Sequence, residues 1–585
     1  MPPQWSARGR PSGGVRAGQV VVLQVAGAVL LAALGRGASA VLGGVAVAAL
    51  LLALAGARVR GRWLFEWLGT ALAYVARRRA LPAEAGPADL LDLVDPGAVV
   101  RSAELAGTPA AVLDDAAGMV ALLEILEPGE LIGDGSRALP PPAALLSAAT
   151  PGGPPVRVQL VLAAVAAPAV ALGGGAVATS YRQLTDGRLP GRERAVLAVR
   201  VLRVDGATPV ELRHALAGTL RRIVRRAGPA SVRPLGEHAA LRVIAELAHH
   251  EAGPARESWS ALRSGSLLQA GFRLDRWPDP RAEGGRRLVS RLLALPATAV
   301  TVALSAGPST HDTTSPPSGL TVRLAAATPG ELATAVQALH RTVDGSGGEV
   351  RRLDGEHLAG LAATVPLALP DGGPPGPAAP ELVIGGAGLL LGANRHGAAV
   401  TVRLFRPEGT RVVLVGGLGA GQMISLRAMA LGARVVVQTA RPRAWEPFVR
   451  GVGTPGGTIP LLPPGRPVGG EPGSPLRPLL LVVDTGPVGP APEPDPPWQA
   501  TVLLRDELTV TDVAALGRAD LALLQPLGRA EATLAGSALG LGESAEWLTR
   551  IREDMVAVVN RRALRWARLT PSPIEAQLIG GPGRH

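Results

Sequence analysis

Residues 17–57 read AGQVVVLQVAGAVLLAAL, then GRG, then ASAVLGGVAVAALLLALAGA. Neither half contains an acidic residue, and the only charge of the stretch is Arg36, in the short break. Each half comes close to the ~20 apolar residues that an α-helix needs to cross a bilayer core. An open strand is excluded there, because lipid offers no partner for free N–H and C=O groups. The stretch therefore predicts a transmembrane helical hairpin that turns at residues 35–37.

Arginine residues flank this hairpin and set its orientation. Basic flanks stay on the cytoplasmic side, so we expect two spans in the inner (plasma) membrane with both termini cytoplasmic. The flanking residues are Arg8, Arg10 and Arg16 before the first half, and Arg58, Arg60, Arg62, Arg77, Arg78 and Arg79 after the second. An alternative is a cleaved signal peptide, because Ala38-Ser39-Ala40 matches an A-x-A cleavage site. That alternative also leaves the bulk of the chain cytoplasmic, because the second half would still cross.

Residues 63–76, WLFEWLGTALAYVA, are too short to span the membrane again. The aromatic residues suit the headgroup level of a membrane, and the arginines that follow can meet anionic lipid. The segment is predicted to be an interfacial helix that fixes the rest of the chain against the membrane. The alternative is a core helix of the soluble part.

Composition excludes several classes of function. The chain has 585 residues and a formal net charge of +12, yet all of its 59 Lys+Arg residues are arginine. Without lysine there is no G-x-x-x-x-G-K-[ST] phosphate loop and no Schiff-base lysine. Without cysteine there is no thiol nucleophile and no cysteine-ligated zinc. No aromatic or zinc-finger pattern accompanies the positive charge, so no nucleic acid partner is expected.

Residues 81–370 predict an α+β lobe with helices on one face of the sheet. A linker with three prolines leads into it at 80–96, and a Pro/Gly-rich break at 368–380 ends it. The expected strands are two within 110–126 around Asp114-Asp115, then 156–165, 195–204, 297–305 and 319–327. Loop is expected at 127–155, and the expected helices begin at Pro209, Gly285 and Pro329.

Two groups of ionisable residues in this lobe favour structural roles. Asp114 and Asp115 suit a turn, and no histidine or third acid stands near them in the sequence for acid–base chemistry. His249, His250 and Glu251 follow a predicted helix at 241–248. Adjacent histidines point to different faces of a helix, whereas chelation prefers i and i+4. We predict no catalytic residue and no metal site.

One glycine-rich segment is the candidate ligand site. Residues 411–445, RVVLVGGLGAGQMISLRAMALGARVVVQTARPRAW, predict a strand, a turn, a helix and a strand. A dinucleotide site requires G-x-G-x-x-G and an acid at the end of the second strand. Gln422 stands at the third glycine position and Gln438-Thr439 end the second strand, although Arg441 could hold a 2′-phosphate. The two mismatches favour a tight turn without a cofactor. The candidate cofactor-binding residues are Gly417, Gly419 and Gly421.

Residues 371–585 predict a Rossmann-like α/β lobe with a mostly parallel sheet and helices on both faces. Its strands at 479–484, 500–504 and 521–524 are short continuous apolar runs, as in a sheet covered on both sides. A Gly/Pro-rich insertion is expected at 451–478, and a last helix with a basic end at 543–569. With residues 1–80 as the hairpin and interfacial helix, the chain has three parts.

Several segments together resemble the EccE family of type VII secretion. They are VLDDAAGMVALLEI (112–125), SYRQL (180–184), ESWSALRSG (257–265), FRLDRWP (272–278), LDGEHLAGLAATVPL (353–367), LFRPEGTRVVLVGG (404–417) and LRAMALGARVVVQTARPRAW (426–445). The resemblance covers nearly the whole chain, and none of these motifs is catalytic. It implies a structural, non-enzymatic subunit of the actinobacterial secretion complex, with two spans and a cytoplasmic domain. The implied partners are EccB-, EccC- and EccD-like subunits, of which the EccC-like one is the ATPase.

Two other classes of function stay open from the residues alone. The first is a membrane-tethered enzyme that depends on a nucleotide or nucleotide sugar and uses the glycine-rich turn at 416–421. The second is a membrane-bound glycosyltransferase-like enzyme, which would need a D-x-D metal motif that the sequence does not contain. Co-purification with an ATPase and a many-span membrane protein would separate the structural subunit from both.

Overall fold

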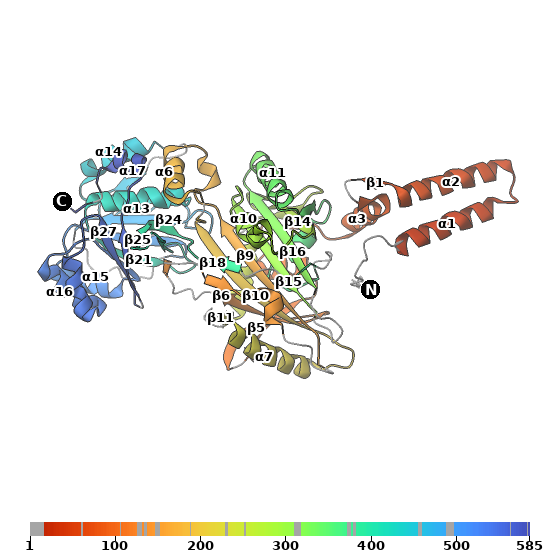
Figure 1. Cartoon of the computed structure of the whole chain (residues 1–585), viewed down its shortest axis with the longest axis horizontal. Helices are drawn as coiled ribbons and strands as arrows, with labels where there is room; N and C mark the ends of the chain where they lie inside the picture. Colours follow the sequence, from red (N-terminus) through yellow and green to blue (C-terminus); the bar gives the residue numbers. More distant parts are fainter. Residues whose placement is uncertain are drawn as a thin grey trace.

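The protein is elongated, with a helical hairpin at one end, an antiparallel-sheet lobe in the middle and a mixed-sheet lobe at the other end (Figure 1). Its structure is a computed structural model. It describes residues 17–584 apart from 60–61, 106, 126–130, 134–136, 147–152, 188, 228–231, 251–252, 309–316, 371–375, 378–381, 454–458, 487–495, 562 and 582. The predicted basic flank at Arg8, Arg10, Arg16 and Arg60 lies outside the described residues.

The N-terminal stretch forms the predicted helical hairpin, α1 (Ala17–Ala33) and α2 (Ala38–Gly56). The two helices touch along a seam of small residues: Ala26, Ala33 and Ala48 are buried, and a Cβ on Gly44 would lie 2.7 Å from the Ala33 Cβ. Their large apolar side chains point outward. Among the residues that the structure describes, no helix has both the length and the apolar character needed to cross a membrane.

A short ribbon and one helix connect the hairpin to the middle lobe. β1 (Arg58–Val59) pairs with β2 (Arg62–Trp63), and α3 (Leu64–Ala76) follows at the base of the hairpin (Figure 1). The predicted linker at 80–96 is wrong, because β3 (Ala80–Leu81) pairs with β12 (Ala255–Glu257) and α4 (Pro87–Val94) buries three leucines. The prolines there do not break structure, because Pro87 occupies the first turn of α4, where its missing N–H costs nothing.

The middle lobe is a 13-stranded sheet in which every pair is antiparallel. The predicted hairpin around Asp114-Asp115 and the other predicted strands are confirmed. In spatial order the strands are β3, β12 (Ala255–Glu257), β13 (Leu262–Ser264), β14 (Leu267–Arg276), β16 (Ser318–Ala326), β15 (Ala299–Ala306), β9 (Val156–Val165), β10 (Arg192–Leu202), β6 (Gly118–Ile125), β5 (Thr108–Asp115) and β4 (Val99–Leu105), with β11 (Val232–Pro234) beside β6 and β17 (Glu349–Arg352) beside β14.

Helices cover both faces of this sheet, so the predicted one-sided layer is wrong. Alternate residues of β9 face opposite ways: Leu160 packs in one core and Val161 in the other. The first core is closed by α5 (Pro142–Leu145), α7 (Pro209–Arg226), α10 (Leu288–Leu293) and α11 (Pro329–Asp344), with α9 (Glu283–Arg286) leading into α10. The second is closed by α4, α8 (Glu237–Leu247) and α12 (His357–Ala362).

The C-terminal lobe is built on an 11-stranded mixed sheet. From β23 to β26 the pairs are parallel, and from β26 to β7 they are antiparallel. The spatial order is β23 (Leu461–Leu462), β22 (Arg434–Thr439), β24 (Leu479–Asp484), β25 (Gln499–Arg505), β21 (Thr410–Val415), β26 (Leu521–Leu524), β27 (Met555–Val559), β28 (Leu564–Arg568), β19 (Leu389–Ala393), β20 (Ala399–Val402) and β7 (Ile132–Gly133).

Helices cover both faces of this second sheet, as predicted. Leu414 faces a core closed by α13 (Leu418–Ala430), α14 (Pro442–Val452), α17 (Pro573–Ile579) and α6 (Ala176–Thr185), which follows the short η1 (Val170–Leu172). Val415 faces a smaller core closed by α15 (Val513–Arg518), α16 (Arg529–Leu539) and η3 (Gly542–Thr549), with η2 (Val510–Asp512) before α15.

Two predictions for this lobe are corrected. The last helix expected at 543–569 is instead η3 followed by the β27–β28 hairpin, because the run Met555–Val559 is rich in β-branched valine and Asn560 caps the turn with a bond from the Ala563 N–H. The insertion expected at 451–478 begins inside α14 and contains β23, which extends the parallel sheet. Residues 454–458 of that insertion lie outside the described residues.

The two lobes share segments across the boundary expected at 368–380. Helix α6 belongs to the first lobe in sequence, yet its Tyr181 lies in the core of the second lobe. Strand β7 closes the second sheet, and β8 (Arg137–Leu139) pairs with β18 (Leu382–Ile384) in a separate ribbon. The lobes are therefore tied by several chain crossings and not by one linker.

Candidate functional site

The glycine turn, residues 416–421, leads from β21 into α13 and is filled by the chain's own groups. The Gly416 N–H donates to the Arg505 carbonyl at 2.8 Å, and the Gly417 N–H donates to Gln525 Oε1 at 2.8 Å. Gln525 follows β26 and is fully buried. The Gly417 amide, which would face a bound phosphate, thus already donates to Gln525, a residue more than a hundred positions later in the sequence.

The C-terminal tail lies over the same turn. A Cβ on Gly417 would meet the Gly583 carbonyl oxygen at 2.7 Å. Arg584 fixes the tail there, because its Nε donates to the Asp506 carbonyl at 2.7 Å and its Nη1 to the Pro526 carbonyl at 2.9 Å. Its guanidinium also forms an ion pair with Glu531. Gly417 is a glycine because the tail passes so close to it.

Arg441, the candidate partner of a 2′-phosphate, is engaged by two carboxylates. Its Nη2 lies 2.8 Å from Asp484 Oδ1, and its Nη1 lies 2.6 Å from Asp506 Oδ2. Hydrogen bonds from these acids raise the pKa of Arg441, so it stays cationic. Asp484 also accepts from Thr439 Oγ1 at 3.0 Å and from Trp445 Nε1 at 2.8 Å. The guanidinium of Arg441 therefore binds two carboxylates of the protein, in place of the 2′-phosphate for which it was the candidate.

The candidate glycines do not together form a cofactor cradle. Gly417 and Gly419 lie at the start of α13, but Gly421 faces the core, where a Cβ would lie 3.1 Å from Leu504 Cδ2. Gln422 is buried and donates to the Ala444 carbonyl at 3.4 Å. Because the turn is covered by the tail and its amide by Gln525, a dinucleotide does not fit the residues present.

The paired aspartates of the middle lobe take the structural role predicted for them. Asp115 Oδ1 accepts from the N–H groups of Ala117 and Gly118 at 2.7 and 2.9 Å, which closes the β5–β6 turn. The fully buried Arg200 lies 2.6 Å from Asp115 Oδ2. Arg203 pairs with Asp114 at 2.7 Å. Both carboxylates are therefore ion-paired and not set out for acid–base work.

The adjacent histidines are buried in the middle lobe. His250 Nε2 lies 2.8 Å from the Ala85 carbonyl oxygen, and burial, with Arg323 nearby, lowers the pKa of His249 well below its usual 6.5. Glu251, the third member of the predicted cluster, lies outside the described residues. In the part of the chain that the structure describes, no group of three metal-ligating side chains converges.

The joint between α3 and the middle lobe is a site that sequence reasoning missed. Arg77 Nη2 lies 2.7 Å from both carboxylate oxygens of the buried Glu257, and it donates to the Gly355 carbonyl at 2.7 Å. The Trp259 ring packs 5.8 Å from Trp67 and 5.4 Å from Tyr74, centroid to centroid.

A second group of contacts strengthens this joint. We name the whole set the α3 joint, and its residues are Arg62, Trp67, Tyr74, Arg77, Glu257, Trp259, Gly355 and Glu356. Arg62 pairs with Glu356 and lies 5.3 Å over the Trp67 ring. A Cβ on Gly355 would lie 2.6 Å from Trp259, so only glycine fits there. The ESW segment at 257–259 and the DGEH segment at 354–357 were visible in the sequence, but nothing in it showed that they meet α3.

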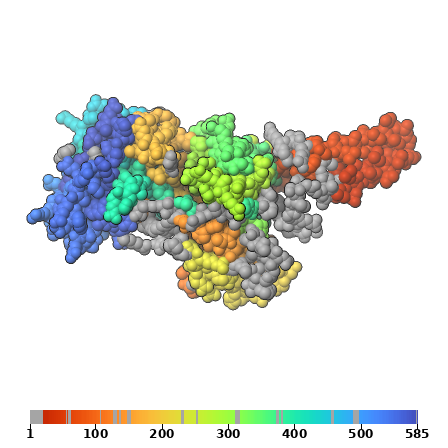
Figure 2. Space-filling view, viewed as in Figure 1, coloured from red at the N-terminus to blue at the C-terminus, as the bar shows by residue number. Residues whose placement is uncertain are grey.

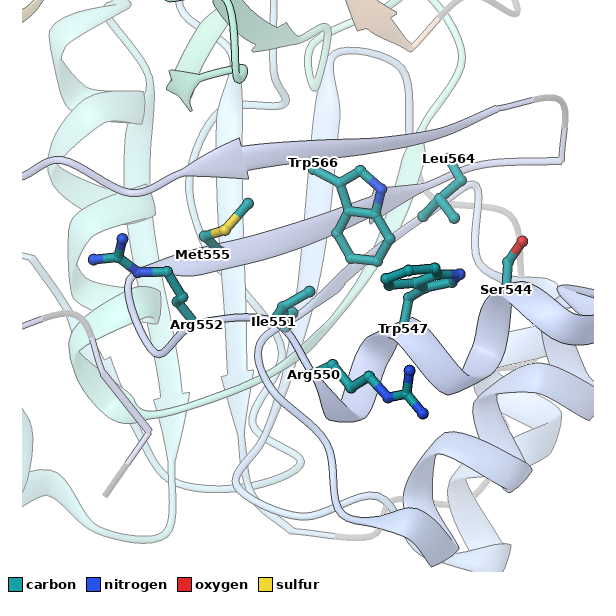
Figure 3. Close-up of a pocket in the computed structure, with 8 residues that line it drawn as sticks. All are labelled: Ser544, Trp547, Arg550, Ile551, Arg552, Met555, Leu564 and Trp566. Carbon is teal, nitrogen blue, oxygen red and sulfur yellow. The ribbon is translucent and has the colours of Figure 1, made fainter.

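A pocket of about 510 Å³ lies between η3 and the β27–β28 hairpin (Figure 3). Trp547 and Trp566 line it with Met555 and Leu564 (Figure 3). Its two arginines are held by acids, since Arg550 pairs with Glu546 and Arg552 with Asp554. The lining is thus apolar with neutralised charge at its rim, and it does not assemble an acid–base pair.

Comparisons with known proteins leave the class open. No protein-family model matches the chain, and no curated protein matches it. The genome packaging NTPase B204 of Sulfolobus turreted icosahedral virus 2, in complex with AMPPCP, aligns over 28% of this chain and 100% of its own at 10% identity, with a TM-score of 0.20. The glycopeptide hexose oxidase DBV29 aligns over 32% of this chain and 41% of its own at 12% identity, with a TM-score of 0.15. Scores this low carry no argument about fold or function.

Proposed function

We propose that the protein is a membrane-anchored structural subunit of a type VII protein secretion complex, which works beside a separate motor ATPase and other membrane subunits. The observation that carries the proposal is the uncovered apolar surface of the hairpin. Leu31 of α1 is 71% exposed and Leu42 of α2 is 72% exposed, and eight more leucines and valines of the two helices are also exposed. Such a surface is unfavourable in water, whereas lipid tails would cover it.

Each helix of the hairpin is a little shorter than the hydrocarbon core of a bilayer, so insertion would require the bilayer to thin locally. With a rise of 1.5 Å per residue, the 17 residues of α1 and the 19 of α2 extend about 25 and about 28 Å, against about 30 Å for a hydrocarbon core. The hairpin projects from the body as a separate arm (Figure 2). Insertion of this arm would leave both large lobes on one side of the membrane.

Helix α3 supports the same arrangement. Its exposed apolar residues Leu68, Leu72 and Val75 follow a spacing of four and three, which places them on one face. A neighbouring face of the helix carries Trp67 and Tyr74 against Trp259. We propose that the exposed face lies in the headgroup layer, so that the α3 joint fixes the lobes at a set angle to the membrane.

The complex itself is proposed from the resemblance to the EccE family, and a non-enzymatic role agrees with the glycine turn being filled by protein. The test is affinity purification of the tagged full chain from its native membrane in mild detergent, followed by mass spectrometry. We expect a P-loop ATPase and a many-span membrane protein in stoichiometric amounts. Recovery of the chain alone, or from the soluble fraction, would contradict the proposal. Nucleotide-dependent turnover by the isolated chain would favour the enzyme alternative.

A further inference from the structure

The order of the parallel strands places the glycine turn where P-loop NTPases hold phosphates. In a large group of these proteins, one strand separates the strand that enters the phosphate loop from the strand that ends in the Walker B aspartate, a magnesium ligand. Here β25 lies between β21, which enters the glycine turn, and β24, which ends at Asp484. Strands β22 and β26 flank this set and run parallel to it. The sheet therefore has the layout of a P-loop domain.

The spacing of residues in the turn agrees with this layout. Residues 416–423 read GGLGAGQM. This segment keeps the two glycines of G-x-x-x-x-G-K-[ST], at Gly416 and Gly421. Gln422 stands in place of the lysine that binds the β- and γ-phosphates, and Met423 stands in place of the hydroxyl residue that holds magnesium. Both replacements are buried, at 6% and 2% exposure. The two side chains that bind nucleotide and metal are thus the two that have changed.

The remaining parts of such a site are occupied by protein. The Gly417 amide, which would face a phosphate, donates to Gln525, and the Gly583 carbonyl lies against the same glycine. Asp484, at the Walker B position, accepts from Arg441, Thr439 and Trp445. The guanidinium of Arg441 therefore lies against Asp484, at the place where an active NTPase would hold its magnesium ion.

The C-terminal tail is held near the glycine turn by the contacts of the helix that precedes it. Helix α17 precedes it, and Glu575 of α17 forms an ion pair with Arg427 of α13 at 2.8 Å, with side-chain exposures of 1% and 2%. Arg427 also donates to the carbonyls of Leu390 and Leu391 at 2.9 and 2.7 Å. Ser572 caps α17 and contacts Ser180 of α6 at 2.8 Å. Since the same helix α13 begins at the glycine turn, its anchor fixes where the tail lies.

We propose that the C-terminal lobe is a P-loop domain that has lost nucleotide binding, and that residues 583–584 of its own tail take the place of the phosphates. The inference is independent of the secretion role. It predicts that the tail shields the turn and that two substitutions together with removal of the tail restore a nucleotide site.

The first test uses the full chain in mild detergent with Mg-ATP as the probe. Three forms are compared: the natural sequence, a restored form with Gln422→Lys and Met423→Ser, and the restored form ending at Gly581. Binding is measured with a fluorescent ATP analogue and as a rise in Tm. We expect no binding by the natural chain, and binding at least tenfold tighter by the restored tailless form than by the restored form with its tail. Binding by the natural chain, equal binding by the two restored forms, or none by a folded restored tailless form overturns the proposal.

A second measurement does not depend on restoring a site. Hydrogen exchange of the amides at 417–421 is compared between the natural chain and the natural chain ending at Gly581, with the amides of β24 as the internal control. If the tail covers the turn, its removal speeds exchange at the turn by at least tenfold and leaves β24 unchanged. Unchanged exchange at the turn would overturn the proposal. This measurement decides alone if the restored tailless form fails to fold.

Discussion

Asp95 is the residue that we expect to make the middle lobe sensitive to pH. Its Oδ2 lies 3.6 Å from Nη2 of Arg200, which is already paired with Asp115. Burial, together with the neighbouring Asp115, raises the pKa of Asp95 from 3.8 to about 7. The folded state therefore holds a proton that the unfolded state releases. The stability that Asp95 contributes is full below about pH 4 and is lost as the pH rises through 7.

The substitution Asp95→Asn tests this expectation. Between pH 5 and 8 the natural chain loses stability, and the variant should lose less, by on the order of 2 kcal/mol. A fall should remain, because burial also raises the pKa of Glu193 to about 7. The measurement is Tm against pH in detergent, with the exposed Asp92→Asn as the matched control. An equal fall in the Asp95→Asn variant and the natural chain would refute the assignment.

Some features of the glycine turn could be predicted from the sequence, and its contacts with distant residues could not. The sequence located the glycine turn and indicated, from Gln422 and Thr439, that a dinucleotide would not fit. It could not show Gln525 or Gly583 against the turn, because those contacts depend on how distant segments of the sheet and tail fold together. The α3 joint escaped for the same reason, since Arg77 and Glu257 are 180 positions apart.

At the scale of elements, the hairpin depends on one close approach. Gly44→Leu should force α1 and α2 apart, because a Cβ there would lie 2.7 Å from the Ala33 Cβ, and overpacking of this kind costs about 1–3 kcal/mol. Gly43→Leu is the matched control, since a Cβ at Gly43 meets nothing within 4 Å. We expect a lower Tm in detergent for Gly44→Leu alone. Equal Tm values for the two variants would show that the helices do not need the small-residue seam.

Elements with a clear periodic pattern were predictable, and those defined by context were not. Helix α7 was expected from Pro209 and from Leu216, Leu220 and Ile223, which are buried on one face. Helix α4 was missed because three prolines suggested a linker, although one of them starts the helix. The run from Met555 was assigned to a helix, yet its valines pair with β26 and β28. Short apolar runs take their form from the neighbours they pair with.

At the scale of the whole molecule, the hairpin, the α3 joint, the middle lobe and the C-terminal lobe follow one another along the long axis (Figure 1). The joint uses a buried carboxylate, Glu257, and a ring stack on Trp259, so the arm is fixed to the body by more than a flexible linker. The crossings of α6 and β7 tie the middle lobe to the C-terminal lobe. A force applied to the hairpin would therefore be passed to both lobes.

Cysteine labelling tests the proposed membrane topology of the hairpin. The natural chain has no cysteine, so background labelling is low. Ser39 lies beside the turn of the hairpin and Ser102 lies in the middle lobe, and both are exposed. With an impermeant thiol reagent on intact cells, Ser39→Cys should be labelled and Ser102→Cys should be labelled only after the cells are broken. Labelling of Ser102→Cys on intact cells, with Ser39→Cys protected, would show that the lobes do not lie on the cytoplasmic side.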